Sequence, residues 1–305
     1  MDFVRAVIVS GLCRHVSITA DMSAAIWAHN AAMPDVRHMD RAPVDDGHVE
    51  YLLHGSGDPI LFIHGAGIAD AFVPLMNRPP LAGLQQIHYR RRGYGQSTAA
   101  GGPPESFMAR AAADAAQLLA HLRVDPAHVV GHSSGALIAL DLACNTPHVV
   151  RSLALLEPPL LGVSSTGPHM AALTPAVERY AAGDRAGAID GLFNVVLGPG
   201  WRPQAALAVP GGAEQAESDA ATFFESELPG VGAWQFDARR AAQVRQPVLF
   251  MMGSATVPFH KEAGERIREW WPESERYVVA GAGHALQIVE PDDVANGIAQ
   301  FIARH

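Results

Sequence analysis

The fold of this chain is decided by one short stretch, Val129-Val130-Gly131-His132-Ser133-Ser134-Gly135-Ala136. The two valines end an apolar run that is typical of a buried strand, and the apolar residues after Gly135 predict a helix. Between them lies the pattern Gly-X-Ser-X-Gly, in which a sharp turn exposes the serine hydroxyl and only glycine fits easily on either side. Ser133 is therefore a candidate nucleophile, and the alternative is an ordinary serine at a helix start.

Apolar runs on both sides of this stretch predict a mostly parallel sheet flanked by helices, an α/β fold. The runs are continuous rather than alternating, as strands covered on both faces require. We expect strands at 87–90, 128–132, 152–157, 247–252 and 277–279, and helices at 106–122, 261–271 and 292–303. The runs 48–53 and 59–63 flank a turn-forming segment, Gly55 to Asp58, and predict an antiparallel hairpin.

The length of 305 residues favours a core with an insertion, or two domains, over one compact domain. Residues 158–243 begin with Pro158-Pro159 and lack strand character. We expect a catalytic core of 39–157 and 244–305, a helical cap of 158–243 over the strand ends, and an N-terminal extension of 1–38. The aromatic residues of the cap are expected to divide between packing and substrate contact: Phe193, Trp201, Phe223, Phe224, Trp234 and Phe236.

The composition limits the classes of molecule that this chain is expected to bind. A formal charge of −9 disfavours nucleic acid and anionic membranes, and no apolar run approaches the roughly 18 residues of a membrane helix. With only Cys13 and Cys144, a disulfide framework is excluded, and a reducing, cytoplasmic location is expected. The Cys and His spacings match no zinc pattern, so neither a metal nor an organic cofactor is expected. A homodimer is compatible with the sequence.

A glycine-rich turn, His64-Gly65-Ala66-Gly67, directly follows the apolar run 59–63. Such a turn leaves backbone N–H groups free in a cavity, where they can stabilise a developing oxyanion together with the residue after the nucleophile. We assign the two donors to Ala66 and Ser134, with Gly65 as the alternative to Ala66. A simple chain reversal would explain the same glycines.

A histidine suited to act as the base lies near the other end of the chain, in Gly281-Ala282-Gly283-His284-Ala285. The chain has 15 histidines, so position must select among them. His284 lies on a loop after the last predicted strand, from which it can reach the serine turn. His64 and His132 also belong to the active-site loops, but at both positions we expect the backbone rather than the side chain to be used.

These three motifs, in this order, resemble the α/β-hydrolase superfamily over about residues 49–302. The resemblance implies a Ser, acid, His order along the chain and a hydrolytic activity. In many members the acid is an Asp in the turn after the strand that here ends at Met252. This chain has Thr256 at that place, and the next acidic residue, Glu262, falls inside a predicted helix.

Glu157, which closes the apolar run 153–156, is the candidate for the missing acid. Neighbouring parallel strands end at the same edge of the sheet, so this carboxylate can reach His284. A glutamate at this place resembles haloalkane dehalogenases and zearalenone lactonases, and the lactonases also use Ser and His. The alternative is a solvated carboxylate at a strand end or an anchor for the cap.

The sequence therefore predicts a serine hydrolase that cleaves a carboxylic ester or lactone of a mostly apolar small molecule through an acyl-enzyme. Two alternatives on the same fold are a carbon–carbon bond hydrolase and a cofactor-free oxygenase. A third is a receptor that binds a ligand in the capped pocket without turnover.

Overall fold

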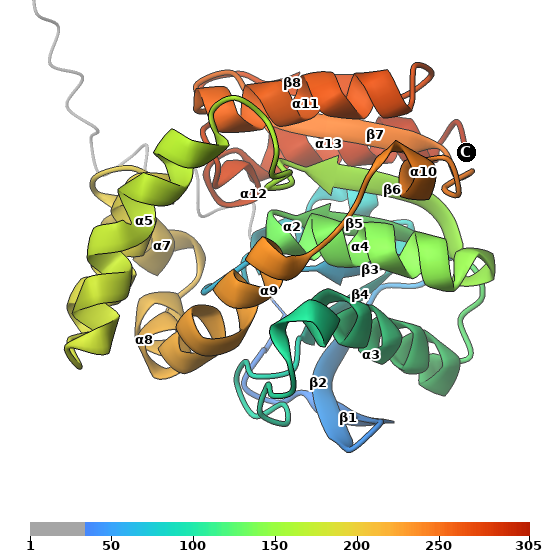
Figure 1. The fold of residues 1–305 in the computed structure, drawn as a ribbon. Helices are drawn as coiled ribbons and strands as arrows, with labels where there is room; N and C mark the ends of the chain where they lie inside the picture. The colour runs from blue at the N-terminus through green and yellow to red at the C-terminus, as the bar shows by residue number, and fades with distance from the viewer. Residues whose placement is uncertain (1–33) are drawn as a thin grey trace, which may run out of the picture. The chain divides into compact units, whose positions relative to one another are not determined.

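The computed structural model describes residues 34–305, and residues 1–33 of the predicted N-terminal extension lie outside the described residues. The strands of the described chain form one sheet in the order β1-β2-β4-β3-β5-β6-β7-β8 (Figure 1). Their bounds are β1 (Asp40–Val44), β2 (Gly47–His54), β3 (Asp58–Ile63), β4 (Leu84–Arg90), β5 (Ala127–His132), β6 (Val150–Leu156), β7 (Val248–Gly253) and β8 (Glu275–Val279).

The predicted hairpin between 48–53 and 59–63 is wrong. Both segments are strands, β2 and β3, but β4 lies between them. β2 pairs antiparallel with β1 and β4, whereas β3 pairs parallel with β4 and β5. All residues of Ile60–Ile63 are buried, so this strand needs neighbours on both sides and helices on both faces. The hydrophobic run of β3 therefore requires an interior position in the sheet, although the turn before β3 is typical of a hairpin.

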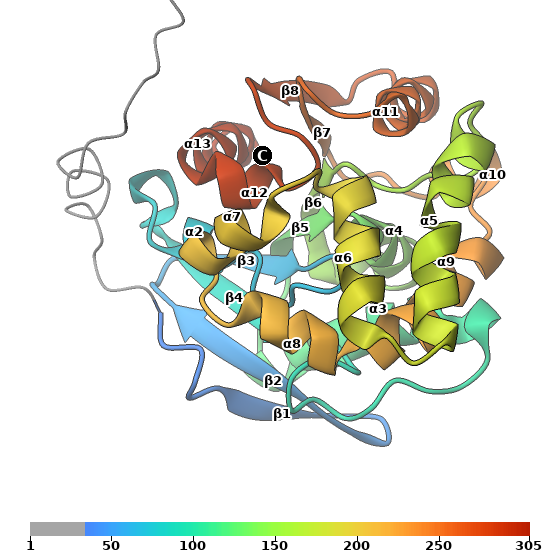
Figure 2. The ribbon, with the colours of Figure 1, turned by 90° about the vertical axis from the view of Figure 1, so that its left-hand side faces the viewer.

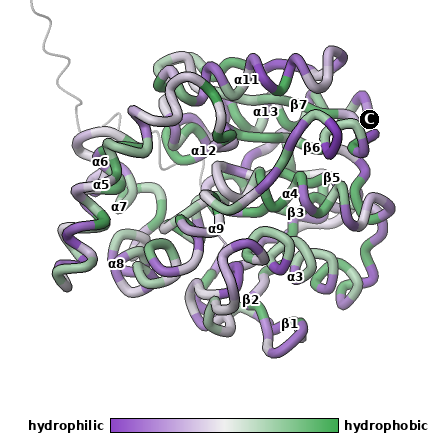
Figure 3. Tube along the Cα trace, viewed as in Figure 1, coloured by the Kyte–Doolittle hydropathy of each residue, from purple (hydrophilic) through white to green (hydrophobic). Residues whose placement is uncertain are grey.

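Helices cover both faces of the sheet, as the continuous apolar strands require. One face packs against α3 (Phe107–Leu122), α4 (Ser134–Asn145) and α11 (Pro258–Trp270). The other packs against α2 (Val73–Met76) and α13 (Pro291–Ile302). Val129 and Val130 belong to different clusters, one on each face of β5. In Figure 3 the hydrophobic colour is concentrated on the central strands and on α4.

The chain between β6 and β7 is helical and contains no strand within 158–243. Its helices are α5 (Thr166–Ala181), α6 (Arg185–Val196), α7 (Trp201–Ala208), α8 (Gly212–Ser218), the π-helical turn η4 (Thr222–Glu227), α9 (Leu228–Ala233) and α10 (Ala238–Ala241). Most of them share a third hydrophobic cluster, separate from the two that flank the sheet. Figure 2 shows α5 to α8 lying in front of the sheet. That residues 158–243 form a separate cap domain stays a prediction.

The remaining short elements are η1 (Pro79–Leu81), η2 (Pro104–Ser106), η3 (Pro147–Val149) and α12 (Leu286–Val289). Of these, α12 follows the loop that carries His284. Across residues 34–305, the structure contains no helix long and apolar enough to cross a bilayer.

Candidate active site

Ser133 lies in the sharp turn between β5 and α4 that the sequence predicts. Its backbone has φ 52° and ψ −127°, a conformation that residues other than glycine rarely adopt. The Ser133 N–H donates to the carbonyl of Leu156 at the end of β6, 2.8 Å away. Strain of this kind persists only where the surroundings hold it, and it is concentrated at functional sites.

The two glycines of the turn are required by close backbone approach. A Cβ at Gly131 would lie 2.5 Å from the carbonyl oxygen of Gly135. A Cβ at Gly135 would lie 2.2 Å from the carbonyl oxygen of Ile63 in β3. Neither backbone atom can give way cheaply, so the pattern Gly-X-Ser-X-Gly follows from how tightly the turn packs.

Glu157 and His284 meet although 127 positions separate them. Glu157 directly follows β6, is fully buried, and has a positive φ of 46°. His284 Nδ1 lies 2.8 Å from Glu157 Oε2, a contact in which the ring N–H donates to the carboxylate. A proton held on Nδ1 leaves Nε2 with its lone pair, the form in which an imidazole can act as a base.

Thr256 holds the glutamate in place. Its hydroxyl donates to Glu157 Oε2 at 2.9 Å, and the Gly253 N–H donates to Oε1 at 2.9 Å. Thr256 stands where the resemblance to other hydrolases leads us to expect the acid, and here it supports a carboxylate that follows the neighbouring strand. Glu262 is engaged elsewhere, because it accepts hydrogen bonds from the N–H and hydroxyl of Ser165.

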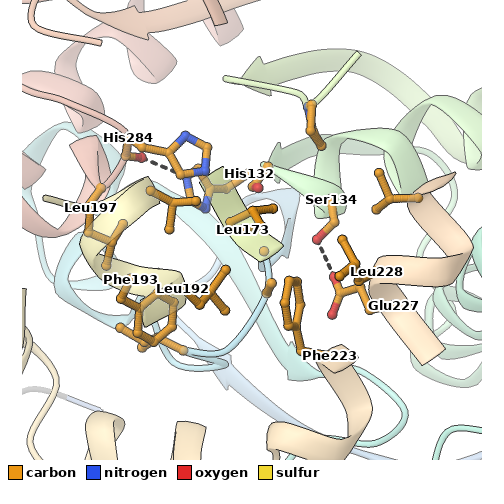
Figure 4. Close-up of a pocket in the computed structure, with 18 of the residues that line it drawn as sticks. His132, Ser134, Leu173, Leu192, Phe193, Leu197, Phe223, Glu227, Leu228 and His284 are labelled. Atoms are coloured by element: carbon orange, nitrogen blue, oxygen red, sulfur yellow. Dashed lines mark hydrogen bonds between the residues drawn. The ribbon is translucent and has the colours of Figure 1, made fainter. Parts of the chain in front are cut away.

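Two further histidines fix the position of His284. His132 Nε2 donates to the backbone carbonyl of His284 at 2.8 Å (Figure 4). The His260 ring stacks on the His284 ring, with 4.3 Å between the ring centroids and 13° between the ring planes. Burial lowers the pKa of His132 to about 3 and the pKa of His260 well below its ordinary value. Burial likewise lowers the pKa of His284, so that all three rings are neutral at neutral pH. The side chain of His132 thus has a structural use that the sequence did not indicate.

The glycine-rich turn after β3 also has the predicted form. Gly65, Ala66 and Ser134 have N–H groups without a hydrogen-bond partner in the described part of the chain, and all three residues line the pocket that contains Ser133. The Gly67 N–H, in contrast, donates to the hydroxyl of Tyr94 at 3.3 Å. The three predicted oxyanion donors are therefore free to bind a ligand oxygen.

The pocket contains about 840 Å³ of empty space, part of it open to solvent, and both Ser133 and His284 line it. The side chains that the segment 158–243 contributes to the pocket are mainly apolar, and most of them are labelled in Figure 4: Leu173, Leu192, Phe193, Val196, Leu197, Phe223 and Leu228. Of the aromatic residues singled out from the sequence, Phe193 and Phe223 line the pocket. Trp201 and Phe224 pack within the third hydrophobic cluster, which the helices between β6 and β7 share. Trp234 and Phe236 pack against the core cluster that includes α4.

The structure brings Ser133, Glu157 and His284 into one region without joining all three. In residues 34–305, Ser133 Oγ makes no hydrogen bond, whereas His284 is already bound to Glu157. Hydrogen bonds between nucleophile and base are often long in unliganded enzymes and tighten when substrate binds.

The polar pocket residues Glu227 and Gln287 were not found from the sequence. Glu227 is the only carboxylate among the described residues that line the pocket, and Gln287 lies one helical turn after His284. Gln287 is fully buried, and neither its amide oxygen nor its amide nitrogen has a hydrogen-bond partner within residues 34–305. No local pattern marks either residue, because Glu227 lies within the cap and Gln287 within a four-residue helix.

Replacing Gln287 with leucine is expected to raise the melting temperature. Each unsatisfied buried polar group costs about 1–3 kcal/mol, and a leucine of similar volume removes two such groups. A gain of about 1 kcal/mol corresponds to a rise of about 2–4 °C in a domain of this size. Gln215→Leu is the matched control, because its amide donates to Asp219 at 2.9 Å and the change should lower the melting temperature. A fall for Gln287→Leu as large as that of the control would contradict the expectation.

One set of potential metal ligands occurs among the described residues: Glu157, His260 and His284, whose ligand atoms all lie within 4.8 Å of one another. The two imidazole rings are stacked and nearly parallel, at an interplanar angle of 13°. The lone pairs of the ring nitrogens lie in the ring planes, so they cannot converge on one ion in this arrangement. The three residues therefore do not fit a metal, and the absence of a cofactor stays a prediction.

Comparison with known proteins supports the fold. The family model described as the alpha/beta hydrolase fold matches residues 58–291. The uncharacterized hydrolase YraK of Bacillus subtilis is 38% identical over 120 residues, which cover 39% of this chain and 44% of that protein. The match thus spans less than half of the length of this relative.

Two longer matches cover most of the chain. RutD of Variovorax paradoxus, a protein named for carbamate hydrolysis, is 28% identical over 271 residues, 84% of this chain and 96% of that protein. The structure of a thermophilic esterase from Thermogutta terrifontis superposes with a TM-score of 0.72 at 18% identity, over 88% of this chain and 98% of the esterase. At that identity the likeness shows the fold alone. The family model covers more than half of the chain, and the chain therefore belongs to the α/β-hydrolase fold family.

Proposed function

We propose that this protein is a serine hydrolase that cleaves a carboxylic ester or lactone through an acyl-enzyme. The observation that carries the proposal is the contact of 2.8 Å between His284 Nδ1 and Glu157, in the pocket that also contains the strained Ser133. A carboxylate that fixes the tautomer of a histidine beside an exposed serine is the arrangement that activates a hydroxyl nucleophile.

In the acylation step, Ser133 Oγ attacks the acyl carbon and His284 Nε2 takes the hydroxyl proton. The tetrahedral intermediate then collapses, and the leaving alkoxide receives that proton from His284. Glu157 keeps the ring oriented and stabilises its protonated form while the charge is present. In deacylation the same imidazole deprotonates a water, which attacks the acyl-enzyme; as the bond from the acyl carbon to Ser133 Oγ breaks, His284 returns the proton to Oγ and the acid is released.

The oxyanion of each tetrahedral intermediate is held by the N–H groups of Ala66 and Ser134, with Gly65 as the alternative to Ala66. Their N–H groups have no hydrogen-bond partner in the described residues, which supports this role. Ser134 is the first residue of α4, so the positive end of the helix dipole adds to the stabilisation of the anion.

The lining of the pocket supports a mostly apolar, medium-sized substrate. Leucine, valine and phenylalanine side chains of the cap face the reacting groups, and they gain free energy by burying hydrocarbon of the substrate. The fold relatives include proteins named as an esterase and as a carbamate hydrolase.

A panel of p-nitrophenyl esters of graded acyl length, assayed beside a panel of lactones, tests the proposal. We expect release of p-nitrophenol, with kcat/KM higher for medium-length acyl chains than for acetate because of the apolar cap. Each methylene buried in the pocket is worth about 0.8 kcal/mol, or roughly fourfold in kcat/KM. A protein that hydrolyses neither panel but binds their members would instead be a receptor.

A further inference from the structure

A buried cluster of polar groups connects the cap to the loops that would bind the oxyanion. Its centre is Glu227, at the last position of the π-helical turn η4, with no exposed surface. The Ser134 hydroxyl, the Tyr94 hydroxyl and Arg91 Nη2, the last at 2.8 Å, all donate to the carboxylate of Glu227. Figure 4 shows the Glu227 carboxylate pointing toward Ser134. Short π-helical segments often occur at functional sites.

Each of these donors lies in, or binds to, one of two segments that we call the oxyanion loops: the glycine-rich turn 64–67 and the turn 133–134. Ser134 follows the nucleophile and supplies one of the proposed donors. Arg91 Nη2 also donates to the carbonyl of Gly65 at 3.0 Å. The Tyr94 hydroxyl accepts the N–H of Gly67 at 3.3 Å.

The residues on both sides of Ala66 are therefore tied, through one intermediate side chain each, to the same carboxylate that holds Ser134. This arrangement fixes the distance between the two proposed N–H donors. Donors that are already in place before reaction cost no reorganisation when the oxyanion forms, which is the basis of their effect on rate.

The charges in the cluster balance. Arg91 is almost fully buried, and its Nε and Nη1 have no partner in the described structure, so Glu227 is the carboxylate that compensates it. Tyr94 stays protonated, because burial and the nearby Glu227 raise its pKa well above the ordinary value. A negative charge beside an oxyanion site would oppose catalysis, but the paired guanidinium cancels it.

We propose that Glu227 is a positioning residue of the hydrolytic reaction, which fixes the oxyanion-binding loops from the cap through Ser134, Arg91 and Tyr94. This inference rests on the proposed function. A buried ion pair is by itself weak evidence of a contribution to stability, since its desolvation offsets its attraction. The contacts end on both oxyanion loops, and this placement assigns the cluster to catalysis.

Glu227→Gln is the main test. The amide keeps the shape of the side chain but cannot accept from all three donors and leaves Arg91 without its counter-charge. We expect kcat on p-nitrophenyl butanoate to fall about 10–100-fold, as for the loss of one oxyanion donor or somewhat less, with KM within about threefold. Tyr94→Phe keeps every charge and loses one link, and we expect a smaller fall in kcat without a change in KM.

A second readout separates positioning from a merely structural role. A trifluoromethyl ketone that adds to Ser133 places an oxyanion between the donors, whereas hexan-1-ol, a neutral apolar ligand, carries no anion for them to bind. We expect the inhibition constant of the ketone to rise in proportion to the fall in kcat, and that of hexan-1-ol to stay unchanged. A change that acted only on stability would lower the melting temperature and leave the ratio of the two constants unchanged.

Glu225→Gln is the matched control. Glu225 lies in the same turn and accepts a hydrogen bond from the Tyr180 hydroxyl, but it is exposed and does not line the pocket. We expect this variant to match the wild type. A folded Glu227→Gln with unchanged kcat and ketone affinity overturns the inference while the hydrolase assignment stands. A wild-type protein without hydrolytic activity overturns both.

Discussion

Ser133→Ala is expected to lower kcat for ester hydrolysis by several powers of ten. The variant loses the attacking oxygen, so only transition-state binding by the oxyanion donors and the pocket remains, which in hydrolases of this type is worth roughly 10³–10⁴-fold over water. The fold should be retained, because the Ser133 hydroxyl makes no hydrogen bond in the described structure. The measurement is kcat and KM on the best p-nitrophenyl ester of the panel.

The matched control for this prediction is Ser218→Ala. Ser218 is an exposed serine at the end of α8, outside the pocket, and its replacement should leave kcat and KM unchanged. If Ser133→Ala kept most of the activity, the reaction would not use a serine nucleophile. A cofactor-free oxygenase, which depends on the histidine with little need of the serine, would then be the better assignment.

Glu157→Gln is expected to lower kcat by about 10²–10⁴-fold. The amide nitrogen would face His284 Nδ1, now 2.8 Å from a carboxylate oxygen, so the ring is favoured in the wrong tautomer and loses support for its protonated form. The oxygen of the amide can still accept from Gly253, which helps the variant to fold. Substrate affinity should change little, because Glu157 does not line the pocket.

Glu262→Gln serves as the control, since Glu262 was the next acidic residue along the chain from Thr256. Its carboxylate binds Ser165, and its loss should alter kcat less than twofold, a change within measurement scatter. Wild-type activity in Glu157→Gln, combined with a large loss in Glu262→Gln, would identify Glu262 in α11 as the acid and refute the assignment of Glu157.

The fold was predictable wherever the hydrophobic pattern was unambiguous. Continuous apolar runs located β3, β5, β6 and β7, and the fold class is confirmed by the family model and the sheet topology. The strand pairing of β3 was not predictable from the turn before it, because the long connection that places β4 between β2 and β3 leaves no local mark. A buried run of four residues was the better guide to its place.

The site was predictable where geometry forces residue types. Gly131 and Gly135 must be glycine because backbone atoms lie within 2.5 Å of the place that a Cβ would take. The sharp turn at Ser133 can therefore be predicted from the sequence. The roles of Thr256 and Glu227 could not be predicted from the sequence, because a threonine or a glutamate is compatible with many environments. Each acquires its partner only when distant segments pack together, as Glu227 does with Arg91, 136 positions away.

The central claim is that Ser133 is a nucleophile activated by His284. The most direct measurement is treatment of the folded protein with a fluorophosphonate, followed by mass spectrometry of the intact chain and of its peptides. We predict one adduct per chain, located on Ser133, with labelling strongly reduced in His284→Ala and absent in Ser133→Ala. An unlabelled Ser133 in the wild type, or equal labelling of the Ser133→Ala variant at another residue, would contradict the account.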